Sequence, residues 1–99
     1  MRVDFTAVAE TDLEAIHDYI ARDNPVRALS FVRDLVQRCT DLAEMPQAFP
    51  VVPRYQHLDI RRRVHGRYLI FYRIQDDRIT ILHILNGAMD VEALLFPQG

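Results

Sequence analysis

The spacing of apolar residues changes in the middle of this chain, from a helical period to a strand period. From residue 9 to residue 45, apolar side chains recur every three or four residues; from residue 58 they alternate with polar ones or form short runs. The first pattern is typical of amphipathic helices and the second of β-strands. A chain with helices first and strands second is expected to fold as an α+β domain, with the helices covering one face of the sheet.

The N-terminal segment predicts a strand and then a helix. The residues from Arg2 to Phe5 alternate and indicate a short strand. The helix shows one apolar stripe, which consists of Ala9, Leu13, Ile16 and Ile20. Thr6 is one candidate N-cap, and Thr11 with Glu14 is a possible capping box. The sequence therefore leaves the start of this helix open between Thr6 and Thr11.

A second helix is predicted directly after the first. Asn24 is a good N-cap, and Pro25 suits a first helical turn because its missing N–H would have no acceptor there. The helix should end near Met45, because Pro46 cannot continue it. Its apolar face consists of Ala28, Leu29, Val32, Leu35, Val36, Cys39, Leu42 and Ala43. Two amphipathic helices joined by so short a turn predict an αα-hairpin.

Residues 46–57 contain Pro46, Pro50 and Pro53, which predict a rigid, extended connection. Three strands follow, at about 58–64, 67–74 and 78–85, and their short turns predict an antiparallel meander. The sequence AMDVEALLF near the end predicts a short C-terminal helix. The predicted fold is α+β, β-α-α-β-β-β with a helical hairpin packed on a small antiparallel sheet. The first strand should join that sheet, because a lone strand leaves its backbone groups unpaired.

Length, charge and composition exclude several classes of function. At 99 residues the chain holds a single domain, 1–99. A net charge of −2 argues against a general nucleic-acid binder, and no direct sequence-specific nucleic-acid binding is expected. All 12 basic residues are arginine, which excludes lysine chemistry. No apolar run approaches the roughly 20 residues of a membrane span, and no signal-peptide pattern is present. No membrane association and a cytoplasmic location are therefore expected.

Single reactive side chains give no sign of an active site. Cys39 lies at helical spacing among apolar residues, so it is interpreted as a core residue. The histidines have no ligand spacing, so neither a metal nor a cofactor is predicted; they are His17, His57, His65 and His83. His83 is interpreted as a satisfied sheet residue. A solvated face of the first helix is expected for its acidic residues Asp12, Glu14 and Asp18.

Four segments, in this order and at this length, resemble the ParE toxins of the RelE/ParE superfamily of bacterial toxin–antitoxin systems, also called plasmid stabilisation proteins. They are DLEAIHDYIARDNP, LAEMP, DIRRRVHGRYLIFYRI and ITILHILNGAMDVEALL, and they span nearly the whole chain. The resemblance implies a small toxin that forms a hetero-oligomer with a cognate, ParD-like antitoxin. It also implies a target, because the ParE branch poisons DNA gyrase, whereas the RelE branch cuts mRNA on the ribosome.

The positions that the RelE branch uses for RNA cleavage are not matched here. Arg62 falls at or near one strand cation. Leu69 stands where a middle-strand arginine is expected, Met89 where an arginine follows the last strand, and Leu95 about where a tyrosine lies. Leucine and methionine neither neutralise a phosphate nor transfer a proton. No catalytic residue is therefore predicted. A ribosome-dependent mRNA endonuclease stays the alternative, with a non-toxic protein-binding domain on the same scaffold as a third reading.

The arginine run and two apolar clusters are the candidate binding residues. In one reading, two of the three arginines line the solvent face and the third extends along the sheet edge. In another, they pair with acidic residues of the antitoxin through bidentate contacts; contacts with gyrase, its DNA or RNA are a third. The groove over the sheet, exposed apolar residues of the hairpin and the apolar C-terminal segment are the other candidates for antitoxin contact. The predicted antitoxin-binding residues are Leu29, Phe31, Arg61, Arg62, Arg63, Leu94, Leu95 and Phe96.

Overall fold

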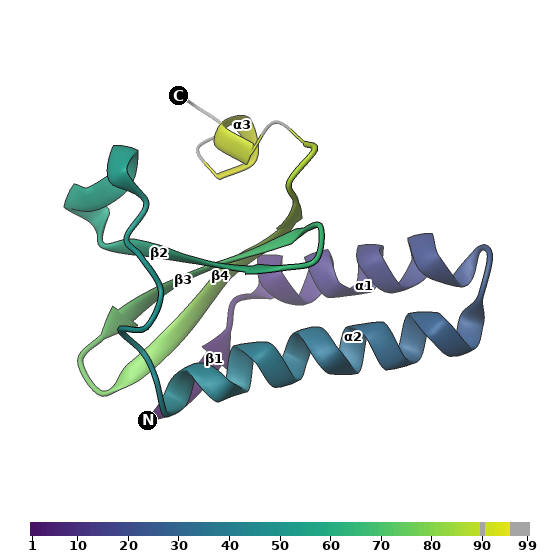
Figure 1. Ribbon diagram of the computed structural model, residues 1–99, viewed down its shortest axis with the longest axis horizontal. Coiled ribbons are helices and arrows are strands. Elements are labelled where there is room, and N and C mark those ends of the chain that lie inside the picture. Colours follow the sequence, from purple (N-terminus) through teal and green to yellow (C-terminus); the bar gives the residue numbers. More distant parts are fainter. Residues whose placement is uncertain (90, 96–99) are drawn as a thin grey trace.

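The computed structural model of this chain describes residues 1–89 and 91–95 (Figure 1). The elements are β1 (Arg2–Phe5), α1 (Ala7–Ala21), α2 (Pro25–Thr40), β2 (Ile60–His65), β3 (Tyr68–Gln75), β4 (Arg78–Asn86) and α3 (Val91–Leu95). Two 3₁₀ segments, Asp41–Ala43 and Pro53–Leu58, lie between α2 and β2. This order confirms the predicted α+β class and element sequence. Among the described helices, none is long and apolar enough to cross a membrane.

The sheet has the strand order β1-β4-β3-β2. β2, β3 and β4 form the predicted antiparallel meander. β1 joins the sheet as predicted, but it pairs with β4 in parallel, with Arg2 opposite Arg78 and Phe5 opposite Ile81. The sheet is therefore mixed rather than wholly antiparallel. The hairpin and the meander separate β1 from β4 in the chain, and a connection of this length permits parallel pairing.

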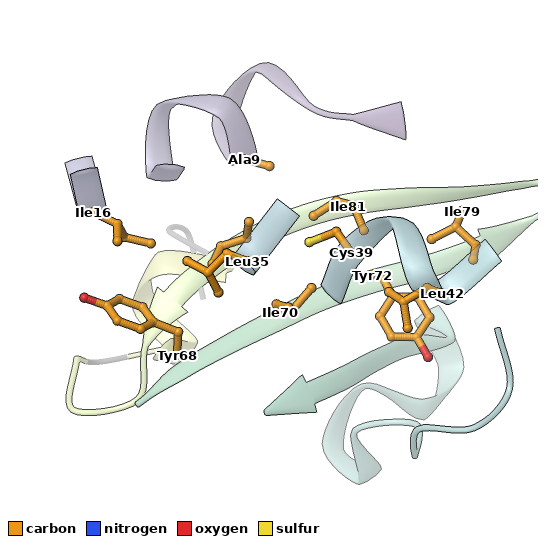
Figure 2. Close-up of a cluster of buried hydrophobic side chains, with 11 residues drawn as sticks. Ala9, Ile16, Leu35, Cys39, Leu42, Tyr68, Ile70, Tyr72, Ile79 and Ile81 are labelled. Carbon is orange, nitrogen blue, oxygen red and sulfur yellow. The ribbon is translucent and has the colours of Figure 1, made fainter. Parts of the chain in front are cut away.

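The α1–α2 hairpin covers one face of the sheet, and α3 lies on the other side (Figure 1). The main core lies between the hairpin and the sheet (Figure 2). Its buried members are Ala9, Ile16, Leu35, Cys39, Leu42, Tyr68, Ile70, Tyr72, Ile79, Ile81 and Ile84. The Cys39 thiol is fully buried there, and burial raises its pKa to about 12. Its sulfur thus remains protonated at neutral pH, which agrees with the predicted packing role.

The cap residues explain where the two long helices start. Thr6 caps α1, because its Oγ1 accepts the N–H of Ala9 at 3.0 Å, and the same hydroxyl donates to the Leu82 carbonyl at 3.1 Å. This ties the start of α1 to β4 and rules out the later start at Thr11. Asn24 caps α2 through its Oδ1, which accepts the N–H of Arg27 at 3.0 Å. Pro25 follows it as predicted.

The second face of the sheet carries a smaller core of Ile60, Phe71 and Leu85. Residues of the proline-rich connection and of α3 cover it; they include Val52, Tyr55, Leu58, Val91 and Leu95. The connection is not wholly extended as predicted, because it contains the 3₁₀ segment Pro53–Leu58. It pairs briefly with the outer edge of β2, where the Val52 N–H donates to the Ile60 carbonyl at 2.8 Å.

A β-bulge in β4 shifts its register against β3. Phe71 lies opposite His83, whereas the next residue, Tyr72, lies opposite Ile81, so Leu82 is the extra residue. A bulge bends its strand and changes the direction of nearby side chains. This one lies just beyond Phe5, the residue at which β1 stops pairing with β4. The edge of β4 is consequently open from the bulge onwards, and α1 crosses it there.

Candidate protein-binding groove

An apolar groove of about 440 Å³ lies between α1, the adjoining ends of β3 and β4, and α3. Its lining residues are Asp12, Ala15, Ile16, Tyr19, Tyr68, Ile84, Leu85, Asn86, Met89 and Leu94. The floor is made by core residues such as Ile16 and Ile84, which are 7% and 1% exposed. The rim is made by Tyr19, Met89 and Leu94, which are 65%, 52% and 37% exposed. Large apolar side chains that gather around a hollow on so small a protein mark a binding surface.

Asp12 is the acidic residue of this groove, and it is not on the solvated face where the sequence predicted it. Its Oδ2 accepts hydrogen bonds from His83 Nδ1 and from the backbone N–H of Ile84, both at 2.9 Å. The Ile84 N–H lies on the open edge of β4, where β1 no longer supplies a carbonyl. The Asp12 carboxylate replaces that missing acceptor. His83 is a satisfied sheet residue, as predicted.

The arginine run does not form one exposed patch. Arg61 and Arg63 lie opposite Tyr72 and Ile70, on the face that the helices cover. Arg61 Nη1 donates to the Phe49 carbonyl at 2.7 Å, and Arg63 Nη1 donates to the Arg38 carbonyl at 3.0 Å. The reading in which two of these arginines line the solvent face is therefore wrong.

The contacts of Arg63 show what the half-buried arginines do. Its guanidinium carbon lies 4.7 Å from the centroid of the Phe49 ring, a cation–π contact. The carbonyl that it bonds belongs to Arg38 in the last turn of α2, where a cation interacts favourably with the helix dipole. Arg63 and Arg61 thus fasten the proline-rich connection and the end of α2 to the sheet edge. Arg62, the middle residue of the run, is exposed on the opposite face.

The apolar candidates from the sequence lie on different surfaces. Leu29 is exposed on α2. Phe31 is half-buried, and its ring centroid lies 5.4 Å from that of Tyr68. Leu94 lines the groove, whereas Leu95 packs against the smaller core. Phe96 lies outside the described residues. The structure therefore brings only Leu94 of the predicted set into this groove, and the role of that set in antitoxin binding stays a prediction.

Sequence reasoning missed the other residues at the rim of the groove. Tyr19 lies three residues after Ile16, so it is next to the apolar stripe of α1 on the helix surface. This spacing indicates that Tyr19 widens the apolar face of the helix. Met89, which stands where the family resemblance leads one to expect an arginine, is exposed at the groove. The other two unmatched positions, Leu69 and Leu95, pack against the smaller core. No group of three or more potential metal ligands occurs within the described part of the chain.

A helical hairpin on a four-stranded sheet, with a short helix on the far face, is the fold of the ParE/RelE-like toxins. The family model described as the ParE toxin of the type II toxin–antitoxin system parDE matches residues 3–91. The chain therefore belongs to the ParE toxin family. It is similar to a solved chain described as the chromosomal ParDE TA system from P. aeruginosa, with a TM-score of 0.71 and 27% sequence identity. That match covers 87% of this chain and 95% of the other.

A second solved chain, a conserved hypothetical protein from Helicobacter pylori determined in solution, aligns with a TM-score of 0.47 and 11% identity. This match covers 89% of the present chain and 96% of the other. None of the curated protein sequences matches this chain significantly.

Proposed function

We propose that this chain is a cytoplasmic toxin that a cognate antitoxin neutralises by binding in the groove between α1, the sheet and α3. The observation that carries the proposal is the exposed apolar rim of Tyr19, Met89 and Leu94 around a floor of core residues. An amphipathic helix binds such a groove through apolar anchors spaced three or four residues apart. Tyrosine is one of the residue types that contribute most to binding energy when a partner buries them.

The target proposed for the toxin is DNA gyrase. The toxin is proposed to inhibit gyrase by binding it, and not to catalyse a reaction such as RNA cleavage. Membership of the ParE family supports this choice. So do Leu69, Met89 and Leu95, which occupy the positions where RNA cleavage would need cationic or proton-transferring groups. A chain that acts in this way would need no cofactor, and its specificity would come from the surface that it presents to gyrase.

Two assays on the full chain test the proposal. The purified protein is added to gyrase and relaxed plasmid, and supercoiling and cleaved DNA are measured by gel electrophoresis. The same protein is added to translating ribosomes, and the integrity of the mRNA is followed. Inhibited supercoiling with intact mRNA supports the proposal. Cleaved mRNA with unaffected gyrase would refute it in favour of the endonuclease alternative.

The antitoxin part is tested separately by co-expression with the short reading frame next to the toxin gene. We expect growth arrest from the toxin alone, rescue by the neighbouring product, and a complex that co-purifies. Normal growth in the absence of the neighbouring product, with unaffected gyrase and intact mRNA, would contradict toxicity. A stable complex under those conditions would identify a protein-binding domain without toxic activity.

A further inference from the structure

A second cavity, of about 320 Å³, lies on the sheet face opposite the α1–α2 core. Its walls come from the start of α1, from residues 58–60, from β3 and β4, and from α3. Apolar side chains such as Ile60 and Leu95 make one part of the lining. The polar part consists of Thr6, Arg73 and His83. No step of the proposed toxin function uses this cavity.

Arg73 is the cation of this cavity, and its Nε is buried without a hydrogen-bond partner among the described residues. The Nε atoms of Arg38 and Arg61 are also buried without a hydrogen-bond partner. However, Arg38 Nε lies 3.6 Å from Asp41 Oδ2, and Arg61 donates to the Phe49 carbonyl through Nη1. The guanidinium of Arg73 has neither a bond nor an ion pair with any other described residue. A buried donor without an acceptor is unfavourable, so an incoming acceptor would be stabilised there.

The first turn of α1 adds unsatisfied backbone donors to the same cavity. In α1, a helix of 15 residues, the N–H of Ala9 bonds to Thr6 Oγ1 and that of Glu10 bonds to the Thr6 carbonyl. The amides of Ala7 and Val8 have no acceptor within the helix. Thr6 and Val8 line the cavity, and the helix dipole makes this end positive. The N-terminus of α1 and the unpaired guanidinium of Arg73 therefore favour the same kind of ligand, an anion.

His83 contributes a third polar group. Its Nδ1 donates to Asp12, so in the neutral ring Nε2 carries a lone pair, which can accept from a hydroxyl group of the ligand but does not donate to its oxyanion. The two hydrogen bonds to Asp12 Oδ2 stabilise its negative charge without cancelling it, so the attraction for an anion has to come from Arg73 and the start of α1.

We propose that this cavity binds a small organic oxyanion, a phosphate or carboxylate group carried on an apolar body. The oxyanion binds between Arg73 and the amide groups at the start of α1, because a guanidinium presents paired donors that match two oxygens of one group. The apolar body packs against Ile60 and Leu95. The volume lies at the lower end of the range for small-molecule sites, which limits the ligand to about the size of a nucleotide. This inference does not depend on toxicity or on the identity of the target.

The test is a titration of the isotopically labelled full chain, followed by NMR, with three probes: inorganic phosphate, adenosine 5′-monophosphate and benzoate. We expect at least one probe to shift the amide signals of Ala7, Val8 and His83 in a saturable manner. Similar affinities for phosphate and the nucleotide would show that the protein recognises only the oxyanion and that the apolar walls add nothing to the affinity. Tighter binding of the nucleotide or of benzoate would show that the apolar walls contribute and would identify the preferred acid.

The variant Arg73→Gln should weaken the binding of the preferred probe by about tenfold or more, because the charged fork is lost. The control is Arg62→Gln, a cation that is exposed on the neighbouring strand of the same face and does not line the cavity. It should change the affinity by less than about twofold. Equal effects of the two substitutions would overturn the proposal. So would an absence of shifts at Ala7, Val8 and His83 with all three probes in the unaltered chain, a result that does not depend on how Arg73→Gln folds.

Discussion

The imidazole of His83 on β4 donates from Nδ1 to Oδ2 of Asp12 on α1 at 2.9 Å, with both side chains less than one-fifth exposed. The residues are 71 positions apart in the chain. The pair links the groove to the cavity that contains Arg73, since Asp12 lines the groove and His83 lines that cavity. The neighbouring residues of α3 are divided in the same way, with Leu94 in the groove and Leu95 in the cavity.

Replacing Asp12 should destabilise the fold more than replacing any other acid of α1. Asp12→Ala removes the acceptor of both His83 and the Ile84 N–H, and leaves the latter unpaired at the edge of β4. We expect a loss of about 1–3 kcal/mol in the free energy of unfolding, measured by urea titration. Glu14→Ala, on the exposed side of the same helix, is the control and should change it by less than about 0.5 kcal/mol. Equal losses would contradict a special role of Asp12.

Asp12 also illustrates what the sequence could not predict. The 3.6-residue period places it beside the apolar stripe of α1, and such positions are usually solvated. Its burial follows from the early end of β1, which leaves an N–H of β4 without a carbonyl. Which strand covers which edge is decided by contacts between residues far apart in the chain. The parallel pairing of β1 with β4 was missed for the same reason.

Local patterns were sufficient for most of the fold. Both long helices, the proline that opens α2 and the three-stranded meander follow from period, cap and turn residues. The period of two correctly placed Arg61 and Arg63 on the face opposite Arg62. It could not show which face the helices cover, because the proline-rich connection and α3 make the other face partly apolar as well. Among the binding residues predicted from the sequence, only Leu94 lines the groove.

The hydroxyl of Tyr72 fixes the proline-rich connection to the core. Tyr72 is fully buried, and its hydroxyl donates to the Pro46 carbonyl at 2.8 Å. Burial raises the pKa of this hydroxyl, so it remains a donor at neutral pH. We expect Tyr72→Phe to lower the free energy of unfolding by about 1 kcal/mol, because one buried hydrogen bond is lost without a change of packing. Tyr19→Phe, at an exposed position, is the matched control and should have no measurable effect.

Alkaline pH should unfold the protein partly through Cys39. Burial raises the pKa of its thiol from 9.0 to about 12. The unfolded chain therefore releases this proton at lower pH than the folded one, and the stabilising contribution is complete below pH 9.0 and lost as pH rises towards about 12. The slope from this group is at most about 1.4 kcal/mol per pH unit. Because the chain has no lysine, its four tyrosines are the main other side chains that titrate in this window.

The measurement is the midpoint of urea unfolding between pH 8 and pH 11 for the natural chain and for Cys39→Ala. The variant has a lower stability throughout, since it leaves a small cavity in the core. What distinguishes the two chains is the slope against pH, which should be smaller in the variant because only the thiol is absent. Tyrosine ionisation is common to both chains and cancels in the comparison. If the urea midpoints of the two chains fell in parallel as pH rises, ionisation of Cys39 would not contribute to the loss of stability.

Two leucines from the predicted antitoxin-binding set distinguish the groove from the outer face of the hairpin. Leu94 lines the groove and Leu29 is exposed on α2. If the antitoxin binds in the groove, Leu94→Ala should weaken the complex by about 1–2 kcal/mol, roughly 5- to 30-fold in Kd, whereas Leu29→Ala should leave it unchanged. Isothermal titration calorimetry measures both. Val64→Ala, exposed on β2 and not part of the groove lining, controls for loss of apolar surface alone. The opposite ranking of the two leucines would move the antitoxin to the hairpin.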